Sequence, residues 1–150
     1  MGTVNPIGNN VADSWAAAKA GKCGIAPITL YDPSEQKVKL AGEVKNLNPA
    51  DYIDKRELRK MDRFTQLAMI SAKEAFTDSG LDMEQEDAGR CGVIFSSGIG
   101  GLGTIQAEHS KGLEKGFDRV SPFFIPMVIV NMAAGQIAIQ YGMKGMCSAV

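Results

Sequence analysis

Three glycines follow an apolar run in the second half of the chain, at a spacing that could cradle a phosphate. Gly98, Gly100 and Gly103 form a G-x-G-x-x-G pattern directly after residues 91–95. In dinucleotide-binding folds, glycines at this spacing let the backbone approach a pyrophosphate at the start of a helix. One hypothesis is therefore a nucleotide-binding domain that uses this glycine loop, residues 98–103.

The residues after the glycine loop do not continue a dinucleotide-binding pattern. Such a fold places an acidic residue about 20 positions further on, at the end of a second buried strand. Asp118 stands at that distance, but residues 111–117 before it do not form a buried apolar run. The favoured interpretation is that the glycines shape a tight connection between a strand and a helix.

The thiols and the single imidazole do not form a recognisable reactive or metal site. Cys23, Cys91 and Cys147 contain no C-x-x-C pair, and His109 is the only histidine. Neither zinc nor another cofactor is implied by this set. We expect Cys23 in a turn, Cys91 in a strand and His109 on a helix surface or in packing, and an odd number of cysteines favours reduced thiols in a cytoplasmic protein.

Charge and hydropathy exclude several classes of partner. The chain has 150 residues, with 16 Lys and Arg against 17 Asp and Glu and a formal net charge of −1. No overall field therefore favours nucleic acid or a membrane surface. No apolar run has transmembrane length, and the first residues lack the basic and then apolar layout of a signal peptide.

One short segment is nevertheless strongly basic. Its charged residues are Lys55, Arg56, Arg59, Lys60 and Arg63. If the segment is helical, the i, i+4 spacing places these side chains on one or two adjoining faces. The segment lacks the interleaved aromatic residues of a nucleic-acid module, so a solvated basic face or a site for an acidic protein is expected.

Alternating helix and strand patterns must position these residues. We expect helices over residues 11–20, from Pro49 to Asp54, over 62–79 and over 126–141, and strands over 91–96 and from Ser148. Asn9 or Asn10 is suited to begin the first helix and Gly21 to stop it, and Gly80 is suited to end the helix over 62–79. Val11, Trp15 and Ala18 are expected to share one apolar face of the first helix. The alternation predicts an α/β fold with a parallel, layered arrangement.

Both ends of the sequence suggest a piece of a larger protein. Residues 1–9 are rich in turn-forming residues, but no strand precedes them. The apolar element that starts at Ser148 has no continuation that could pack or turn. We therefore expect residues 1–150 to be one α/β domain that is incomplete at both ends.

Six segments together resemble the β-ketoacyl-acyl-carrier-protein synthases that elongate fatty acids. They are residues 4–9, 59–64, 75–81, 97–101, 121–126 and 141–145. Each segment alone is a weak signal, but their order and spacing are specific and span essentially the whole chain. The resemblance implies a thiolase-like fold of two similar halves, of which this chain is most of the first, and a cytoplasmic homodimer.

The reaction implied by the resemblance is a decarboxylating Claisen condensation of an acyl thioester with malonyl-acyl carrier protein, which gives 3-oxoacyl-acyl carrier protein. A cysteine thiolate carries the acyl group, and two histidines stabilise the enolate charge. In the family these residues lie beyond the position of Val150. Cys147 is followed by residues unlike the family's nucleophile turn, so we expect no catalytic residue and no activity in this chain alone.

By resemblance, three residues contribute to an acyl pocket. Ile99 lines the inner wall of the acyl tunnel, and Phe124 and Ile125 approach the tunnel of the partner subunit across the dimer interface. A fatty chain requires an apolar channel, in which each buried methylene contributes about 0.8 kcal/mol.

By the same resemblance, Arg56, Arg59 and Lys60 bind the acidic acyl carrier protein, and Arg119 adds a contact from a second loop. The family often has a basic residue next to that arginine, whereas this chain has Asp118. One further function stays open besides the nucleotide-binding domain. It is a non-catalytic partner subunit of a polyketide system, of the chain-length-factor type.

Overall fold

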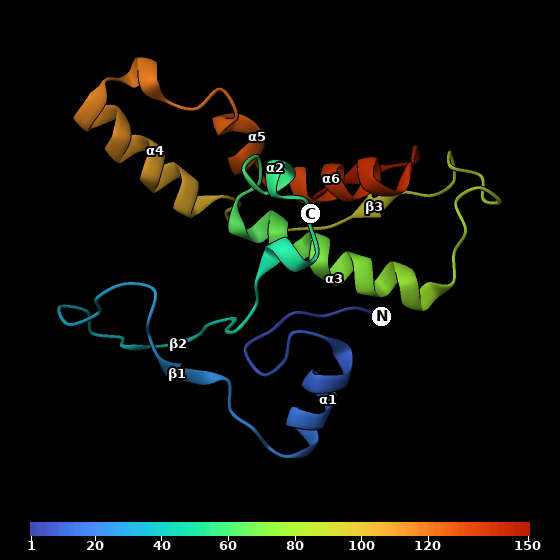
Figure 1. Cartoon of the computed structure of the whole chain (residues 1–150), viewed down its shortest axis with the longest axis horizontal. Coiled ribbons are helices and arrows are strands. Elements are labelled where there is room, and N and C mark those ends of the chain that lie inside the picture. Colours follow the sequence, from blue (N-terminus) through green and yellow to red (C-terminus); the bar gives the residue numbers. More distant parts are fainter.

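A long central helix organises the molecule, whose computed structural model describes all 150 residues (Figure 1). This helix, α3, spans Arg63–Ser79; the Asp62 carboxylate caps its first turn, and Gly80 ends it at φ 68°. Helix α6 (Met132–Tyr141) packs on α3. The predicted helix over residues 62–79 is confirmed, because its start and stop signals are local.

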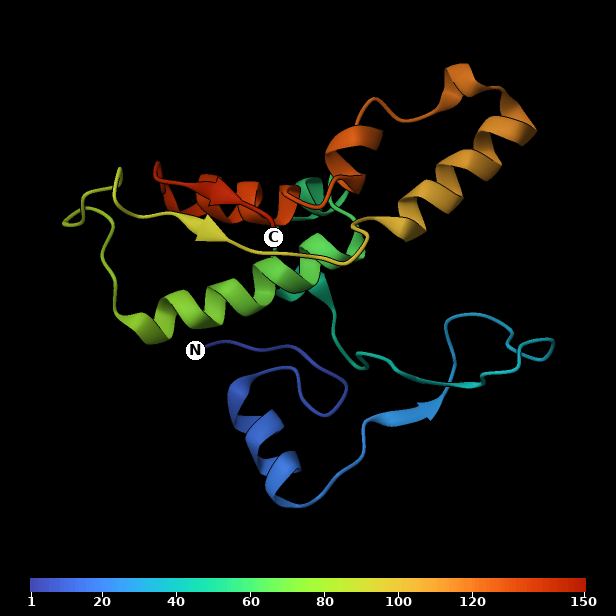
Figure 2. The ribbon, with the colours of Figure 1, turned by 180° about the vertical axis from the view of Figure 1, so that it is seen from behind.

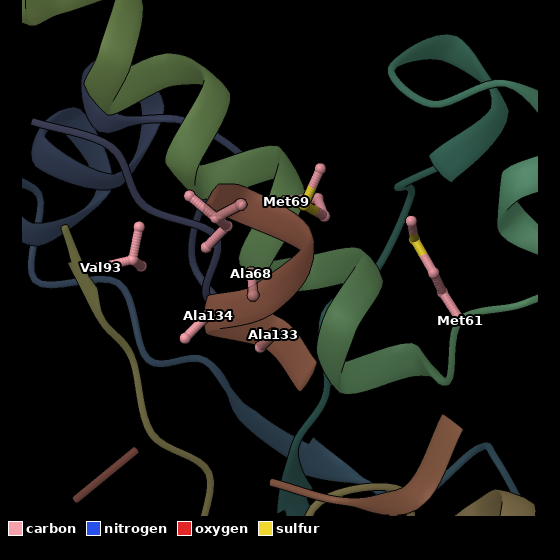
Figure 3. Packing of buried hydrophobic residues seen from close by; sticks show 7 residues of the cluster. Met61, Ala68, Met69, Val93, Ala133 and Ala134 are labelled. Carbon is pink, nitrogen blue, oxygen red and sulfur yellow. The ribbon is translucent and has the colours of Figure 1, made fainter. Parts of the chain in front are cut away.

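The core lies between these two helices. Ala68 on α3 faces Ala133 and Ala134 on α6, and such small side chains let the helix backbones come close together (Figure 3). The buried cluster is completed by Met61, Met69, Val93 and Ile137.

Two short two-stranded sheets accompany the helices. β3 (Val93–Ile94) pairs in parallel with β4 (Cys147–Ser148), which confirms the parallel arrangement expected for these segments. β1 (Ile25–Pro27) pairs antiparallel with β2 (Leu40–Gly42). We call residues 25–43 the hairpin. The sequence did not predict it, because three-residue strands separated by a long connection show little periodicity.

The first helix has the predicted ends but not the predicted inward face. α1 spans Val11–Lys19, and the Asn10 side chain accepts a hydrogen bond from the Asp13 N–H at 2.8 Å. Its buried residues are Ser14 and Ala17, whereas Trp15 is 63% exposed. Trp15 and Ala18, two members of the predicted apolar face, are therefore exposed. Ser14, whose hydroxyl accepts a hydrogen bond from the Asn5 amide, and Ala17 face the rest of the chain instead.

Two further predictions need correction. The helix expected from Pro49 to Asp54 is a 3-10 turn, η1 (Pro49–Asp51), and Asp54 caps the next helix, α2 (Lys55–Leu58). The helix expected over residues 126–141 is divided into α5 (Phe124–Val128) and α6. Ile129 ends α5 by adopting an extended conformation with ψ 137°.

The packed pair of helices α3 and α6 forms a layer, from which the remaining elements project. α4 (Leu102–Lys115), η2 (Phe117–Arg119) and α5 form an arm, residues 102–128: α4 extends away from α3 and α6 with η2 at its tip, and α5 returns to contact α6 (Figure 2). The hairpin also lies apart from the layer. None of the helices has both the length and the apolar character that a membrane crossing requires.

Candidate functional site

The glycine loop connects β3 to α4 and lies against the end of α5. Gly100 has φ 82°, and a side chain at this position would collide with the carbonyl oxygen of Val128. The N–H of Gly101 donates to that same oxygen at 3.0 Å, and the N–H of Gly100 donates to the Ser97 hydroxyl at 3.0 Å. Gly100 and its neighbour Gly101 therefore provide close backbone packing in a tight strand-to-helix connection, as expected, whereas Gly98 and Gly103 have room for a side chain.

The start of α4 is already occupied by an anion. Oδ2 of Asp62 accepts hydrogen bonds from the N–H of Thr104 at 3.0 Å and from the Thr104 hydroxyl at 2.6 Å. A phosphate at this helix N-terminus would compete with the carboxylate for the same donors and would be repelled by its charge. This arrangement contradicts the hypothesis of a nucleotide-binding domain.

The structure brings the predicted acyl-pocket residues onto adjoining segments. Ile99 stands on the glycine loop and is 61% exposed, whereas Phe124 and Ile125 form the start of α5, with Ile125 57% exposed. The hydrogen bond from Gly101 to Val128 holds the loop and this helix together. Exposed apolar side chains in such a group are suited to an apolar ligand or a protein surface.

The residues of the predicted basic patch do not lie on one continuous helix. Arg56 lies on α2 and Arg59 caps its C-terminal end, and a turn then leads through Lys60 to Arg63, where α3 begins. Arg56 and Arg59 are exposed and take part in none of the ion pairs of the structure. Lys60 is paired with Glu57 at 2.7 Å.

Arg119 is separated from the other predicted carrier-binding residues. It ends η2, at the far end of the arm from α2 (Figures 1 and 2). Its Nε atom lies 3.5 Å from the carboxylate of Asp118, and both side chains are exposed. Surface pairs of this kind contribute little stability, so Arg119 can exchange this partner for another carboxylate.

Sequence reasoning missed a second carboxylate that shapes the arm. Oε2 of Glu108 accepts a hydrogen bond from the N–H of Ser121 at 2.7 Å and pairs with the Lys111 ammonium at 3.1 Å. The hydrogen bond from Ser121, followed by that from Lys111, lowers the pKa of Glu108. The E-x-x-K spacing predicts the pair with Lys111, but the contact with Ser121 depends on how the chain turns after η2.

The cysteines and the histidine do not form a cluster: Cys91 and Cys147 lie on the paired segments around β3 and β4, and Cys23 and His109 lie on other elements. Cys147 is on β4 and exposed, Cys91 precedes β3, Cys23 precedes β1, and all three are free thiols. His109 is exposed on α4, with its ring centroid 6.4 Å from that of Phe117, which confirms its predicted place on a helix surface. No group of three or more acidic, histidine or cysteine side chains is arranged to hold a metal ion.

Comparisons with known proteins agree on one family. The family model "Beta-ketoacyl synthase, N-terminal domain" matches residues 1–150. The chain is 50% identical over 145 residues to 3-oxoacyl-[acyl-carrier-protein] synthase 2 of Staphylococcus aureus, which covers 97% of this chain and 36% of that protein. The chain thus spans about a third of the length of the curated relatives that it matches.

Solved structures support the same fold. The ishigamide ketosynthase/chain length factor superposes with a TM-score of 0.83 at 26% identity, over 99% of this chain and 38% of that one. A type II polyketide ketosynthase in complex with its acyl-carrier protein gives a TM-score of 0.74 at 20% identity, over 97% of this chain and 38% of that one. The thiolase-like α/β fold expected from the sequence is confirmed.

Proposed function

The chain belongs to the beta-ketoacyl synthase family, and we propose that it is the N-terminal part of a longer 3-oxoacyl-acyl-carrier-protein synthase. The enzyme would elongate fatty acyl chains by decarboxylating condensation with malonyl-acyl carrier protein. The 50% identity to a synthase 2 over almost the whole chain is the observation that carries this proposal. The nucleophilic cysteine and both histidines belong to the part of the protein beyond residue 150.

In this proposal the glycine loop and α5 supply the acyl pocket. Ile99 forms part of the tunnel wall, and Phe124 and Ile125 approach the tunnel of the partner subunit across the proposed dimer interface. The close packing of Gly100 and Gly101 on Val128 supports this assignment, because it fixes the loop that carries Ile99 against the helix that carries Phe124 and Ile125. A fatty chain buried in an apolar tunnel contributes about 0.8 kcal/mol for each methylene.

The basic residues near α2 supply the surface for the carrier protein. Arg56 and Arg59 are exposed and free of ion pairs, so an acidic partner can bind them without first breaking an internal contact. Lys60 and Arg119 would exchange their present carboxylate partners, Glu57 and Asp118, for those of the carrier. A structural relative is itself a ketosynthase bound to an acyl-carrier protein.

We also propose that the protein is a cytoplasmic homodimer and that a second copy covers the arm. Large apolar side chains stand exposed along it, namely Leu102, Ile105, Leu113, Phe117, Phe123 and Ile125. An apolar surface of this extent is typical of a protein interface.

A non-catalytic subunit of the chain-length-factor type is the second candidate. The structural match to a ketosynthase/chain length factor favours it, but at 26% identity compared with 50% for the synthase 2. The residue at the nucleophile position of the longer protein distinguishes the two, because only the synthase has a cysteine there.

Condensation assays test the proposal directly. The longer protein should form 3-oxoacyl-acyl carrier protein from acyl- and malonyl-acyl carrier protein, and the 150-residue chain should form none. Activity of the short chain that is abolished by Cys147→Ala would contradict the assignment of the nucleophile. A longer protein that binds the carrier but never condenses would support the chain-length-factor candidate.

A further inference from the structure

One carboxylate joins the two parts of the proposed site. Oδ1 of Asp62 accepts the N–H of Phe64 at 3.3 Å and caps α3, while Oδ2 accepts the N–H and the hydroxyl of Thr104 at 3.0 and 2.6 Å. Helix α4 has no side-chain cap of its own, because its N-cap residue is Gly101. Asp62 therefore caps two helices whose first turns are far apart in the sequence.

The position of Asp62 connects the carrier surface to the acyl pocket. Arg59 and Lys60 precede Asp62 by three and two residues, and Met61, which lies between Lys60 and Asp62, is buried in the core. On its other side, the carboxyl carbon lies so near Gly101 that a Cβ on this glycine would be 3.1 Å away. The loop that carries Ile99 thus rests on the same residue that ends the carrier-binding segment.

We propose that Asp62 is a positioning residue that fixes the Ile99 loop relative to the carrier-binding surface, and so determines which acyl chain lengths are accepted. This inference rests on the proposed function. Without Oδ2, the first turn of α4 loses its only side-chain cap, and the glycine loop can shift along Val128. Carrier protein bound at Arg59 and Lys60 acts on the segment that holds this carboxylate.

The substitution Asp62→Asn isolates the contact with α4. Asparagine is as good an N-cap as aspartate, but its amide has one acceptor oxygen and cannot serve Phe64 and Thr104 together. Thr104→Val removes only the hydroxyl donor. Asp54→Asn is the matched control, because Asp54 caps α2 through the N–H of Arg56 at 2.7 Å and has no hydrogen bond to α4.

The measurement is kcat/KM of the longer protein for two primers, one with a short and one with a long acyl chain, each attached to acyl carrier protein. We expect Asp62→Asn to change the ratio of the two values by about tenfold, since small displacements in a site change rates strongly. Thr104→Val should change the ratio in the same direction, and Asp54→Asn should leave it within about twofold. A merely structural cap would lower both values equally, and that result would overturn the proposal.

Amide hydrogen exchange separates this inference from the proposed function. If the wild-type protein elongates no primer, the proposed function fails. Exchange at the amides of Gly101 and Thr104 then tests whether Asp62 positions the glycine loop and α4. Faster exchange at these two amides in Asp62→Asn than in Asp54→Asn would support the positioning contact. Equal exchange in the two variants would overturn it.

Discussion

The layer of α3 and α6 and the arm of α4, η2 and α5 use apolar side chains in opposite ways. In the layer, Ala68, Ala133 and Ala134 meet inside the chain and are almost fully buried. In the arm, side chains as large as Leu113 and Phe117 face outward. The layer obtains its stability from burial within the chain, whereas the arm leaves apolar side chains exposed, and in the proposed dimer a second copy covers them.

Polar contacts take the place of burial in the arm. Asp62 holds the first turn of α4 through Thr104, and Glu108 holds the segment after η2 through Ser121. Both proposed acyl-pocket segments are thus positioned by hydrogen bonds to carboxylates. Residues that must contact a substrate or partner cannot also be buried in the core, so their placement depends on such contacts.

The largest effect should come from opening the layer. Ile137→Ala removes a side chain that is 5% exposed and should lower the free energy of unfolding by about 2–5 kcal/mol, because it leaves a cavity. Ile139→Ala on the same helix is the control; Ile139 is 74% exposed, so its loss should cost no more than about 0.5 kcal/mol. Urea unfolding of the longer protein measures both, and equal costs would contradict the assigned core.

A charged substitution in the arm should weaken the association of two copies of the protein. Phe117→Asp places a charge on the exposed apolar surface of the arm and should weaken the proposed dimer by about 2 kcal/mol, or roughly 30-fold in the dissociation constant. Sedimentation of the longer protein at several concentrations measures this change. A dimer of unchanged strength would mean that the second copy binds elsewhere.

The acyl pocket should respond through chain-length selection. Ile99→Phe in the longer protein should lower kcat/KM for long primers by about tenfold, because the larger ring fills the tunnel wall. Short primers should still react, since no catalytic residue is altered. If long and short primers keep the wild-type ratio, Ile99 does not line the tunnel.

The carrier surface should respond to salt. Arg56→Glu combined with Arg59→Glu should slow transfer from acyl carrier protein about fivefold at low ionic strength, mainly through the association rate. The difference in transfer rate between the variant and the wild type should fade at 1 M salt, where the Debye length is about 3 Å. Acyl-coenzyme A is the control donor, and an equal loss with both donors would indicate a folding defect.

The smallest effect should be local to the hairpin. Glu43 is buried and accepts hydrogen bonds from the Thr29 hydroxyl and N–H and from the Leu30 N–H; those from Thr29 are the main reason that its pKa is lowered. The contact is therefore complete above the unfolded pKa of about 4.3 and is lost as pH falls through the lower folded value.

Protection against hydrogen exchange at Thr29 and Leu30, relative to the intrinsic rate at each pH, should fall through that acidic range before the amides of α3 lose protection. Glu43→Gln is the control, because its side chain does not titrate and protection should lose this pH dependence. Simultaneous loss of protection in the hairpin and α3 would mean that the two regions unfold together.

Local signals in the sequence determined the helix ends and the family. Asn10, one of the two predicted caps, starts α1, Asp62 starts α3, and Gly80 stops α3, because each of these signals acts on backbone groups of the adjacent helical turn. The order of the motifs identified the family for the same reason, since each motif is a short continuous segment.

Only the tertiary structure decided which distant segments meet. The pairing of β1 with β2, the outward position of Trp15 and the break between α5 and α6 were not predictable from local periodicity. The contact of Asp62 with Thr104 joins residues 42 positions apart and changes a simple helix cap into a link between the first turns of two helices. Such a contact depends on how the chain packs as a whole, because one carboxylate can satisfy donors on any helix that is brought near it.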